Sequence, residues 1–165
     1  MAWFVVAGAV ACDSPEGPDP VPGGPGWRES QAVAIHEAVY RFQFEEHAAG
    51  AQPGSITFCL ARTTPDDDLP WSDPPEALLR RFAGHVPVVK KASLCRLDLR
   101  GDTDPATGGP AIIFRVAPPQ WQSDTEVLVD GGYHSHGLSA SGETYRVRYQ
   151  SGGWVVVEAI WRWIS

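Results

Sequence analysis

The stretch ETYRVRYQSGGWVVVEAIWRW (143–163) decides the fold class of this chain. Two runs rich in aromatic and β-branched residues lie on either side of Ser-Gly-Gly, which is typical of a short hairpin turn. Three earlier runs, at 92–99, 111–117 and 124–136, have the same strand-like composition. Because consecutive strands joined by short turns run in opposite directions, these five runs predict an antiparallel sheet.

Two helices and one more strand are expected before this sheet. In residues 30–49, Ile35, Val39 and Phe42 recur at helical spacing and predict a long helix that ends at Gly50. The run SITFCLAR (55–62) alternates apolar and small side chains, which indicates a strand.

The stretch DPPEALLRRFAG (73–84) predicts a second, shorter helix. Asp73 is a suitable N-cap, Pro74 fits the first turn, and Glu76 completes a box-like D-x-x-E pattern. We expect Leu78 and Phe82 to form its buried side.

Helices followed by consecutive strands predict a single globular α+β domain over residues 27–165. We expect a curled antiparallel sheet of about five to six strands, packed on the long N-terminal helix and the short second helix. This order of elements resembles the cone of the NTF2-like and cystatin-like folds. In addition, the run 137–165, with its Gly-Leu-Ser-Ala-Ser-Gly, Tyr-x-Val, Gly-x-Trp-x-Val and Trp-Ile-Ser motifs, resembles the ending of a group of uncharacterised bacterial proteins, and that resemblance implies no site residue.

The N-terminal residues have the organisation of a processing signal. Residues 1–11 are apolar and end in Ala-Val-Ala directly before Cys12, and residues 13–26 contain five prolines, four glycines and three acids. This pattern resembles a bacterial lipoprotein signal, which implies that 1–11 is removed, Cys12 is lipidated, and 12–26 is a tether. A chain of this composition would reach up to roughly 40 Å from its anchor in extended form. The alternative is that residues 1–11 form a first strand or helix of the fold.

The net charge limits the partners of this chain, and its cysteines indicate the compartment. The net charge of −7 argues against a nucleic-acid partner, because such proteins need a face rich in Lys and Arg. With Cys12 lipidated, Cys59 and Cys95 remain as a pair, which predicts a disulfide in an oxidising compartment or, alternatively, two independent buried thiols. We therefore expect a protein of the bacterial cell envelope, at its periplasmic or extracellular face, attached to the membrane through its N-terminal lipid only.

The histidines of GGYHSHGLSASG (131–142) invite a functional interpretation. Strand alternation would place Asp130, His134 and His136 on one face, and these side chains are reasonable ligands for zinc or iron. A strand spaces alternate residues too widely for one metal to reach all three easily. We therefore expect a solvated polar face, and neither a metal nor another cofactor. The serines miss the G-x-S-x-G spacing of a nucleophile elbow by one residue, and the run 137–142 is expected to be a hairpin loop.

Two classes of function stay open. In the first, the domain is a binding or accessory module for a protein or glycan, using Trp121, Trp154, Trp161 and Trp163, with core packing of these tryptophans as the alternative. Alternation over 153–163 places Trp161 and Trp163 on one face and Trp154 on the other. In the second, a cone pocket carries out acid–base chemistry, as the NTF2-like resemblance implies, and the candidate groups are His36, Tyr40, Asp130, His134 and His136. Because no convincing catalytic set is present, we expect a binding function rather than an enzyme.

Overall fold

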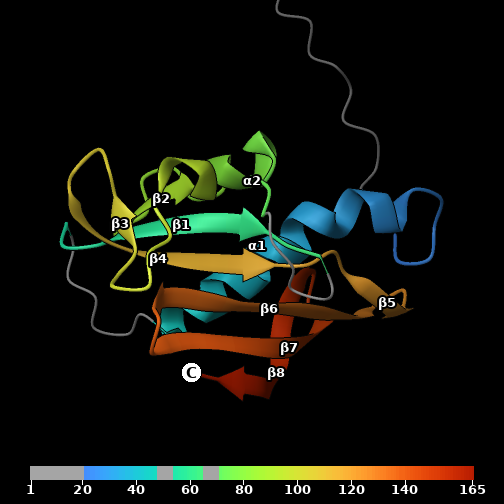
Figure 1. The fold of residues 1–165 in the computed structure, drawn as a ribbon. Coiled ribbons are helices and arrows are strands. Elements are labelled where there is room, and N and C mark those ends of the chain that lie inside the picture. Colours follow the sequence, from blue (N-terminus) through green and yellow to red (C-terminus); the bar gives the residue numbers. More distant parts are fainter. Residues whose placement is uncertain (1–20, 48–53, 65–70) are drawn as a thin grey trace, which may run out of the picture.

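The long helix α1 (Trp27–His47) lies across one face of a curled sheet in the computed structural model, which describes residues 21–47, 54–64 and 71–165 (Figure 1). The sheet is mixed, has eight strands and does not close into a barrel. The prediction of an α+β domain with a curled sheet on a long helix is therefore confirmed. Residues 1–12, with the predicted signal and Cys12, and most of the tether lie outside the described residues. None of the helices in the described part of the chain is both long and apolar enough to span a bilayer.

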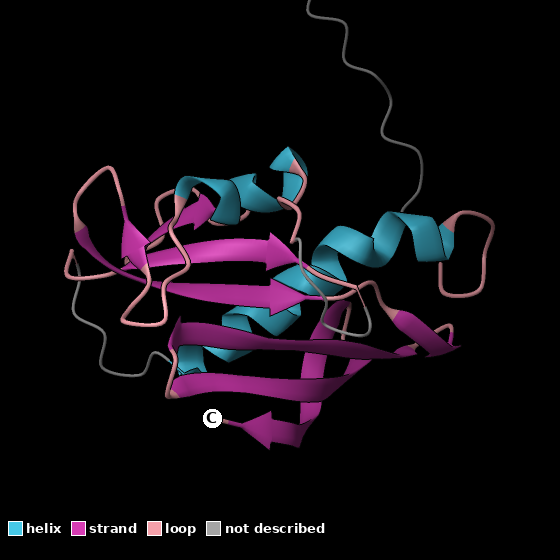
Figure 2. Ribbon diagram, in the orientation of Figure 1, coloured by secondary structure: helices cyan, strands magenta, loops and turns pink. Residues whose placement is uncertain are grey.

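The strands are β1 (Thr57–Arg62), β2 (Val88–Lys91), β3 (Thr103–Asp104), β4 (Gly109–Val116), β5 (Gln120–Ser123), β6 (Glu126–His136), β7 (Ser139–Gln150) and β8 (Gly153–Ile164). Their order across the sheet is β2-β1-β4-β6-β7-β8, with β3 paired to β4 and β5 paired to β6 (Figure 2). The strands β4, β6, β7 and β8 form a continuous antiparallel series, as the sequence predicted.

The strand β1 departs from the antiparallel prediction. It pairs parallel to β2 on one side and parallel to β4 on the other, with Thr57 opposite both Val88 and Ala111. Parallel neighbours need a long crossover connection. The segment between β1 and β2 provides one, because it contains the helix α2 (Glu76–Arg80).

Two local predictions upstream of β3 are wrong. The helix α2 begins after Pro75, so Asp73 does not cap it and its carboxylate instead accepts hydrogen bonds from Ser93. The run 92–99 is not a strand: residues Ala92–Leu94 form a short 3-10 helix, η1, and Arg96 makes only an isolated bridge to Thr103.

The main core lies between α1 and the face of the sheet that the helix covers, which we call the helix-side face. Phe44 of α1 packs against the rings of Phe58 and Phe114, with centroids 4.7 and 5.0 Å apart. Tyr40 is fully buried and its hydroxyl donates to the carbonyl of Ala61. The opposite side, which we call the outer face, carries a smaller apolar cluster of Cys59, Ala61, Ala111 and Ile113.

Interruptions in the strand ladders change which side chains share a face. In the β7–β8 ladder, Gly142 pairs with Trp163 but the next residue, Glu143, pairs with Trp161, so β8 has one extra residue at this point. As a result Trp161 contacts His47 of α1 on the helix side, whereas Trp163 lies by Arg115 on the outer face. The prediction that these two tryptophans share a face is therefore wrong, because strict alternation assumes a ladder without bulges. A similar shift separates His134 from His136 in β6.

The predicted hairpin loop at 137–142 is shorter than expected. Only Gly137 and Leu138 form the turn, and β7 begins at Ser139. Gly132 and Gly142 fall inside strands, where a side chain would clash with the backbone at Gly132 and would have to displace the Trp163 ring at Gly142. A Cβ at Gly132 would lie 1.9 Å from the carbonyl oxygen of Ser141, and one at Gly142 would lie 2.3 Å from Nε1 of Trp163.

Candidate ligand-binding pocket

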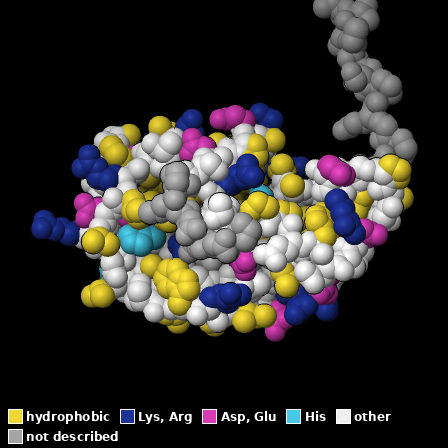
Figure 3. Space-filling model, turned by 45° about the vertical axis from the view of Figure 1, so that its right-hand side comes forward, with side chains coloured by type: hydrophobic (Ala, Val, Ile, Leu, Met, Phe, Trp, Pro, Cys, Tyr) yellow, Lys and Arg dark blue, Asp and Glu magenta, His cyan; other side chains and the backbone are white. Residues whose placement is uncertain are grey.

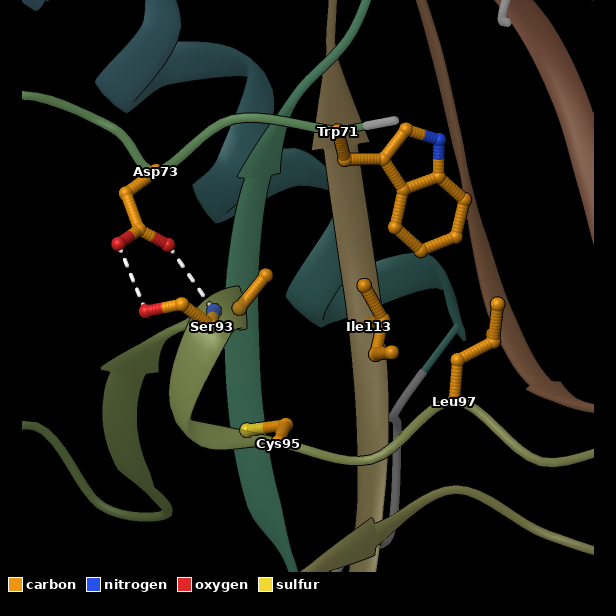
Figure 4. Close-up of a pocket in the computed structure, with 7 residues that line it drawn as sticks. Trp71, Asp73, Ser93, Cys95, Leu97 and Ile113 are labelled. Carbon is orange, nitrogen blue, oxygen red and sulfur yellow. Dashed lines mark hydrogen bonds between the residues drawn. The ribbon is translucent and has the colours of Figure 1, made fainter. Parts of the chain in front are cut away.

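A pocket of about 450 Å³ opens on the outer face, where the 3-10 segment crosses over β1 and β4 (Figure 4). Figure 4 shows Ile113 between Asp73 and Ser93 on one side and Leu97 on the other, with the indole of Trp71 above them. The lining residues are Trp71, Asp73, Ala92, Ser93, Cys95, Leu97 and Ile113. Most of the lining is apolar, with an aromatic wall and a single carboxylate, which is the composition of a small-molecule site.

Asp73 forms the polar side of the pocket. Its two carboxylate oxygens accept from the backbone N and from Oγ of Ser93, at 2.9 and 2.7 Å, and Nζ of Lys91 lies 3.7 Å away. Partial burial raises the pKa of Asp73, but the hydrogen bonds from Ser93 and the charge of Lys91 outweigh it and lower the pKa overall. The carboxylate is therefore ionised at neutral pH and keeps lone pairs for a ligand hydroxyl.

A disulfide joins the far wall of the pocket to the sheet. Cys95, which follows η1, is bonded to Cys59 in the middle of β1, with Cα atoms 6.4 Å apart. Of the two alternatives that the sequence left open for these cysteines, the structure has the disulfide. It holds the 3-10 segment over β1 and so fixes the distance between the pocket's walls.

Beside the pocket, a buried arginine lies between two indoles. The guanidinium of Arg115 is 5.7 Å from the ring centroid of Trp71 and 5.4 Å from that of Trp163. Arg115 also donates from Nη2 to the carbonyl of Ser141 at 2.9 Å. The Trp163 ring occupies the space that a side chain at residue 142 would fill. The guanidinium therefore packs against the ring of Trp71, the aromatic wall of the pocket.

Asp130 and His134 of β6 also lie on the outer face, but the register shift after His134 separates His136 from them, and the three side chains do not converge. Nδ1 of His134 is 2.8 Å from Oδ2 of Asp102, whose pKa is raised by burial despite the hydrogen bond from His134. Asp130 accepts instead from Thr144 and Gln120, and Nδ1 of His136 accepts from the backbone N of Leu138. No group of three or more His, Cys, Asp or Glu side chains suited to a metal is found among the described residues.

The other two predicted acid–base residues, His36 and Tyr40, lie on the helix side of the sheet. His36 is 5% exposed, and burial, together with the charge of Arg62, lowers its pKa to about 4. Burial raises the pKa of Tyr40. Since His134 is on the outer face, the five candidate acid–base residues are divided between the two sides of the sheet.

The four predicted binding tryptophans also have different environments. Trp154 is 8% exposed, and its Nε1 donates to Gln31 in the core. Trp121 packs edge-on against Trp154. Trp161 and Trp163 are 55% and 44% exposed. Figure 3 shows hydrophobic side chains at several places on the surface, lying among charged side chains and beside a histidine. The tryptophan that lines the pocket, Trp71, was not among the predicted site residues. Nothing in its local sequence distinguishes it from a tryptophan in an ordinary loop.

A buried polar network on the helix side was not predicted from the sequence. Nε2 of His47 lies 3.0 Å from Oε1 of Glu143, and the hydroxyls of Ser141 and Tyr145 both donate to that carboxylate. Tyr145 also accepts from Nε2 of Gln43. The sequence pattern that could have predicted it is the alternation of Ser141, Glu143 and Tyr145 on one face of a strand. The same pattern is equally typical of a solvent-exposed face.

Comparison with known proteins does not extend this description: no family model, no curated protein and no solved structure matches the chain.

Proposed function

We propose that this protein is an extracytoplasmic, lipid-anchored binding domain whose outer-face pocket takes a saccharide ring. The observation that carries the proposal is the combination of Trp71 and the ionised Asp73 on two sides of one apolar pocket. A sugar ring has an apolar C–H face and a rim of hydroxyls. The C–H face suits an indole, and the hydroxyls suit a carboxylate acceptor.

The rigidity of the pocket supports binding. Asp73 is held by two hydrogen bonds from Ser93, Cys95 by its disulfide, and Trp71 by the guanidinium of Arg115. Side chains that are already ordered lose little conformational entropy when a ligand binds. A ligand with only a small apolar surface can therefore still bind.

The proposed location rests on two features of the chain. The Cys59–Cys95 disulfide fits an oxidising compartment. The signal-like residues 1–11 and Cys12 fit export and lipidation, and the Pro/Gly-rich tether fits a domain that works at some distance from a membrane. A soluble or wall-bound glycan is the class of ligand that such a domain meets there.

The binding test uses the full chain with Cys12→Ser, so that no lipid is attached. Chitotetraose and maltotetraose, each titrated into labelled protein, are expected to produce NMR shifts at the Trp71 indole and the Ile113 methyls for at least one of the two sugars. Trp71→Ala should abolish these shifts. Trp161→Ala removes a more exposed indole on the other face of the sheet and should leave them unchanged. The proposal of a saccharide site is wrong if neither sugar shifts these signals, or if both variants lose binding equally.

A further inference from the structure

The strand β8 forms one edge of the sheet, and it carries large apolar side chains on both of its faces. β7 pairs with one side of β8, and no strand of the described ranges pairs with the other side. Long apolar edges are uncommon in monomers, because their unpaired backbone groups bind other strands. The exposed large side chains of this strand, between 41% and 68% exposed, are Val155, Val157, Ile160, Trp161, Trp163 and Ile164.

A groove between this edge and the helix offers space for side chains of an added strand. The cavity has a volume of about 280 Å³. Its lining includes Phe42, Arg41 and Glu45 of α1, and Trp154, Val155 and Val156 of β8. An added strand directs alternate side chains to opposite faces, so a helix-side residue placed opposite Val156 would enter this groove.

The charged residues of β8 indicate that the added strand is β8 of a second copy. The only charged residues of β8 are Glu158 and Arg162, two positions on either side of Ile160. Glu158 accepts from Arg146, and Arg162 donates to Thr144, so both side chains lie on the outer face. In an antiparallel pair of β8 strands centred on Ile160, each Glu158 faces the Arg162 of the other copy. A register centred on Glu158 would instead bring two carboxylates together.

The irregularities of β8 are compatible with this axis. The β7–β8 ladder shifts on either side of the segment 158–161, which itself pairs regularly with residues 143–146 of β7. Glu158 and Ile160 lie within this regular segment, and Arg162 is the extra residue directly after it. We propose that β8 pairs antiparallel with β8 of a second copy across a two-fold axis at Ile160, so that the two sheets become one. This inference is independent of the saccharide site.

The charge pair provides the first test. Sedimentation equilibrium of the full chain with Cys12→Ser should show a monomer–dimer equilibrium. Glu158→Arg or Arg162→Glu alone should raise the dissociation constant about tenfold or more, since like charges then face each other across the axis. The double variant Glu158→Arg/Arg162→Glu should recover most of the loss. Leu138→Arg places a charge in the β6–β7 turn, at a residue 84% exposed, and should have no effect.

The position of the axis provides a second test that does not depend on charge. Directly opposed residues in an antiparallel pair have Cα atoms roughly 4.5–5.5 Å apart, which is within the range of a disulfide. Ile160→Cys in the Cys12→Ser chain should therefore form a covalent dimer on oxidation, whereas Leu138→Cys should not. A chain that stays monomeric throughout, or that pairs only with other proteins or with lipid vesicles, overturns the proposal. So does a dimer that neither weakens with Glu158→Arg nor cross-links through residue 160.

Discussion

His47 and Glu143 form a side-chain contact that is almost completely enclosed, with side chains 6% and 1% exposed. His47 ends α1 and Glu143 lies in β7, so the pair connects the helix to the sheet. Burial raises the pKa of Glu143, but the hydrogen bonds from His47, Tyr145 and Ser141 outweigh it and lower the pKa overall. The carboxylate is therefore ionised inside the domain and depends on these partners.

Replacing Glu143 by leucine should lower the free energy of unfolding by about 1–3 kcal/mol, because the hydroxyls of Ser141 and Tyr145 and the ring of His47 stay buried without their acceptor. The double variant His47→Leu/Glu143→Leu should be less destabilised than the single variant. Urea denaturation measures both. For comparison, Asp124→Ala breaks an exposed ion pair with Arg28 and should cost about 0–1 kcal/mol. If Glu143→Leu and Asp124→Ala lower the free energy of unfolding equally, the buried contact contributes no more to stability than the exposed ion pair.

His36 should make stability depend on pH between about 6.5 and 4. Its pKa is lowered from 6.5 to about 4 in the folded state, so the folded protein binds fewer protons than the unfolded chain in this range. The stability from His36 is thus fully present above pH 6.5 and is lost as the pH falls toward 4, by about 3 kcal/mol in total. Denaturation at several pH values should show this slope.

The variant His36→Gln should have a flatter stability profile over this pH range, because glutamine does not titrate. His136 is exposed, and His136→Gln should keep the full slope of the unmodified protein. If the slope persists in His36→Gln, the pH dependence comes from other groups.

Gly142→Ala should displace the Trp163 indole from Arg115. The added methyl group would lie 2.3 Å from Nε1 of Trp163, so the ring has to move. We expect a loss of stability of about 1–3 kcal/mol and a changed chemical shift of the Trp163 indole N–H. Gly153→Ala, in the same hairpin, meets no atom within 4 Å and should change neither quantity. An unchanged Trp163 signal in Gly142→Ala would contradict this packing.

The proposed anchor predicts the mass of the mature protein. Protein isolated from its native membrane should begin at Cys12 and carry a diacylglyceryl group, since the residues before Cys12 resemble a lipoprotein signal. Mass spectrometry of the intact chain measures this directly. An unmodified chain that still begins with Met1 and is found in the cytosol would refute both the anchor and the proposed compartment.

The elements that depend on local patterns could be predicted from the sequence. The spacing of Ile35 and Val39 predicted α1, and the Ser-Gly-Gly turn predicted the β7–β8 hairpin. The parallel neighbours of β1 could not be predicted in this way, because alternation identifies a strand but not its partners. Asp73 shows a related limit. Its position suited an N-cap, but hydrogen bonds from a residue distant in sequence, Ser93, decided its role.

The sites were harder to predict than the fold. The pocket brings together Trp71, Ser93 and Ile113, which come from separate segments and share no motif. His47 and Glu143 are likewise far apart in the sequence, and only the packing of α1 against β7 brings them into contact. The alternation that grouped Trp161 with Trp163 assumed a regular ladder, and one extra residue in β8 was enough to separate them.

The parallel pairing of β1 determines the order in which this protein can fold. β1 is not joined to either of its partners by a short turn, and it stays unpaired until the chain has been synthesised at least as far as β2. Cys59 lies in the middle of β1, and Cys95 lies on the path that leads to β4. Once the two are joined, β1 is confined near the strand that it must meet, and less chain entropy is lost when the sheet closes. Oxidation and sheet assembly are then one coupled event, and a reducing environment would slow the folding of this domain as well as weaken the folded state.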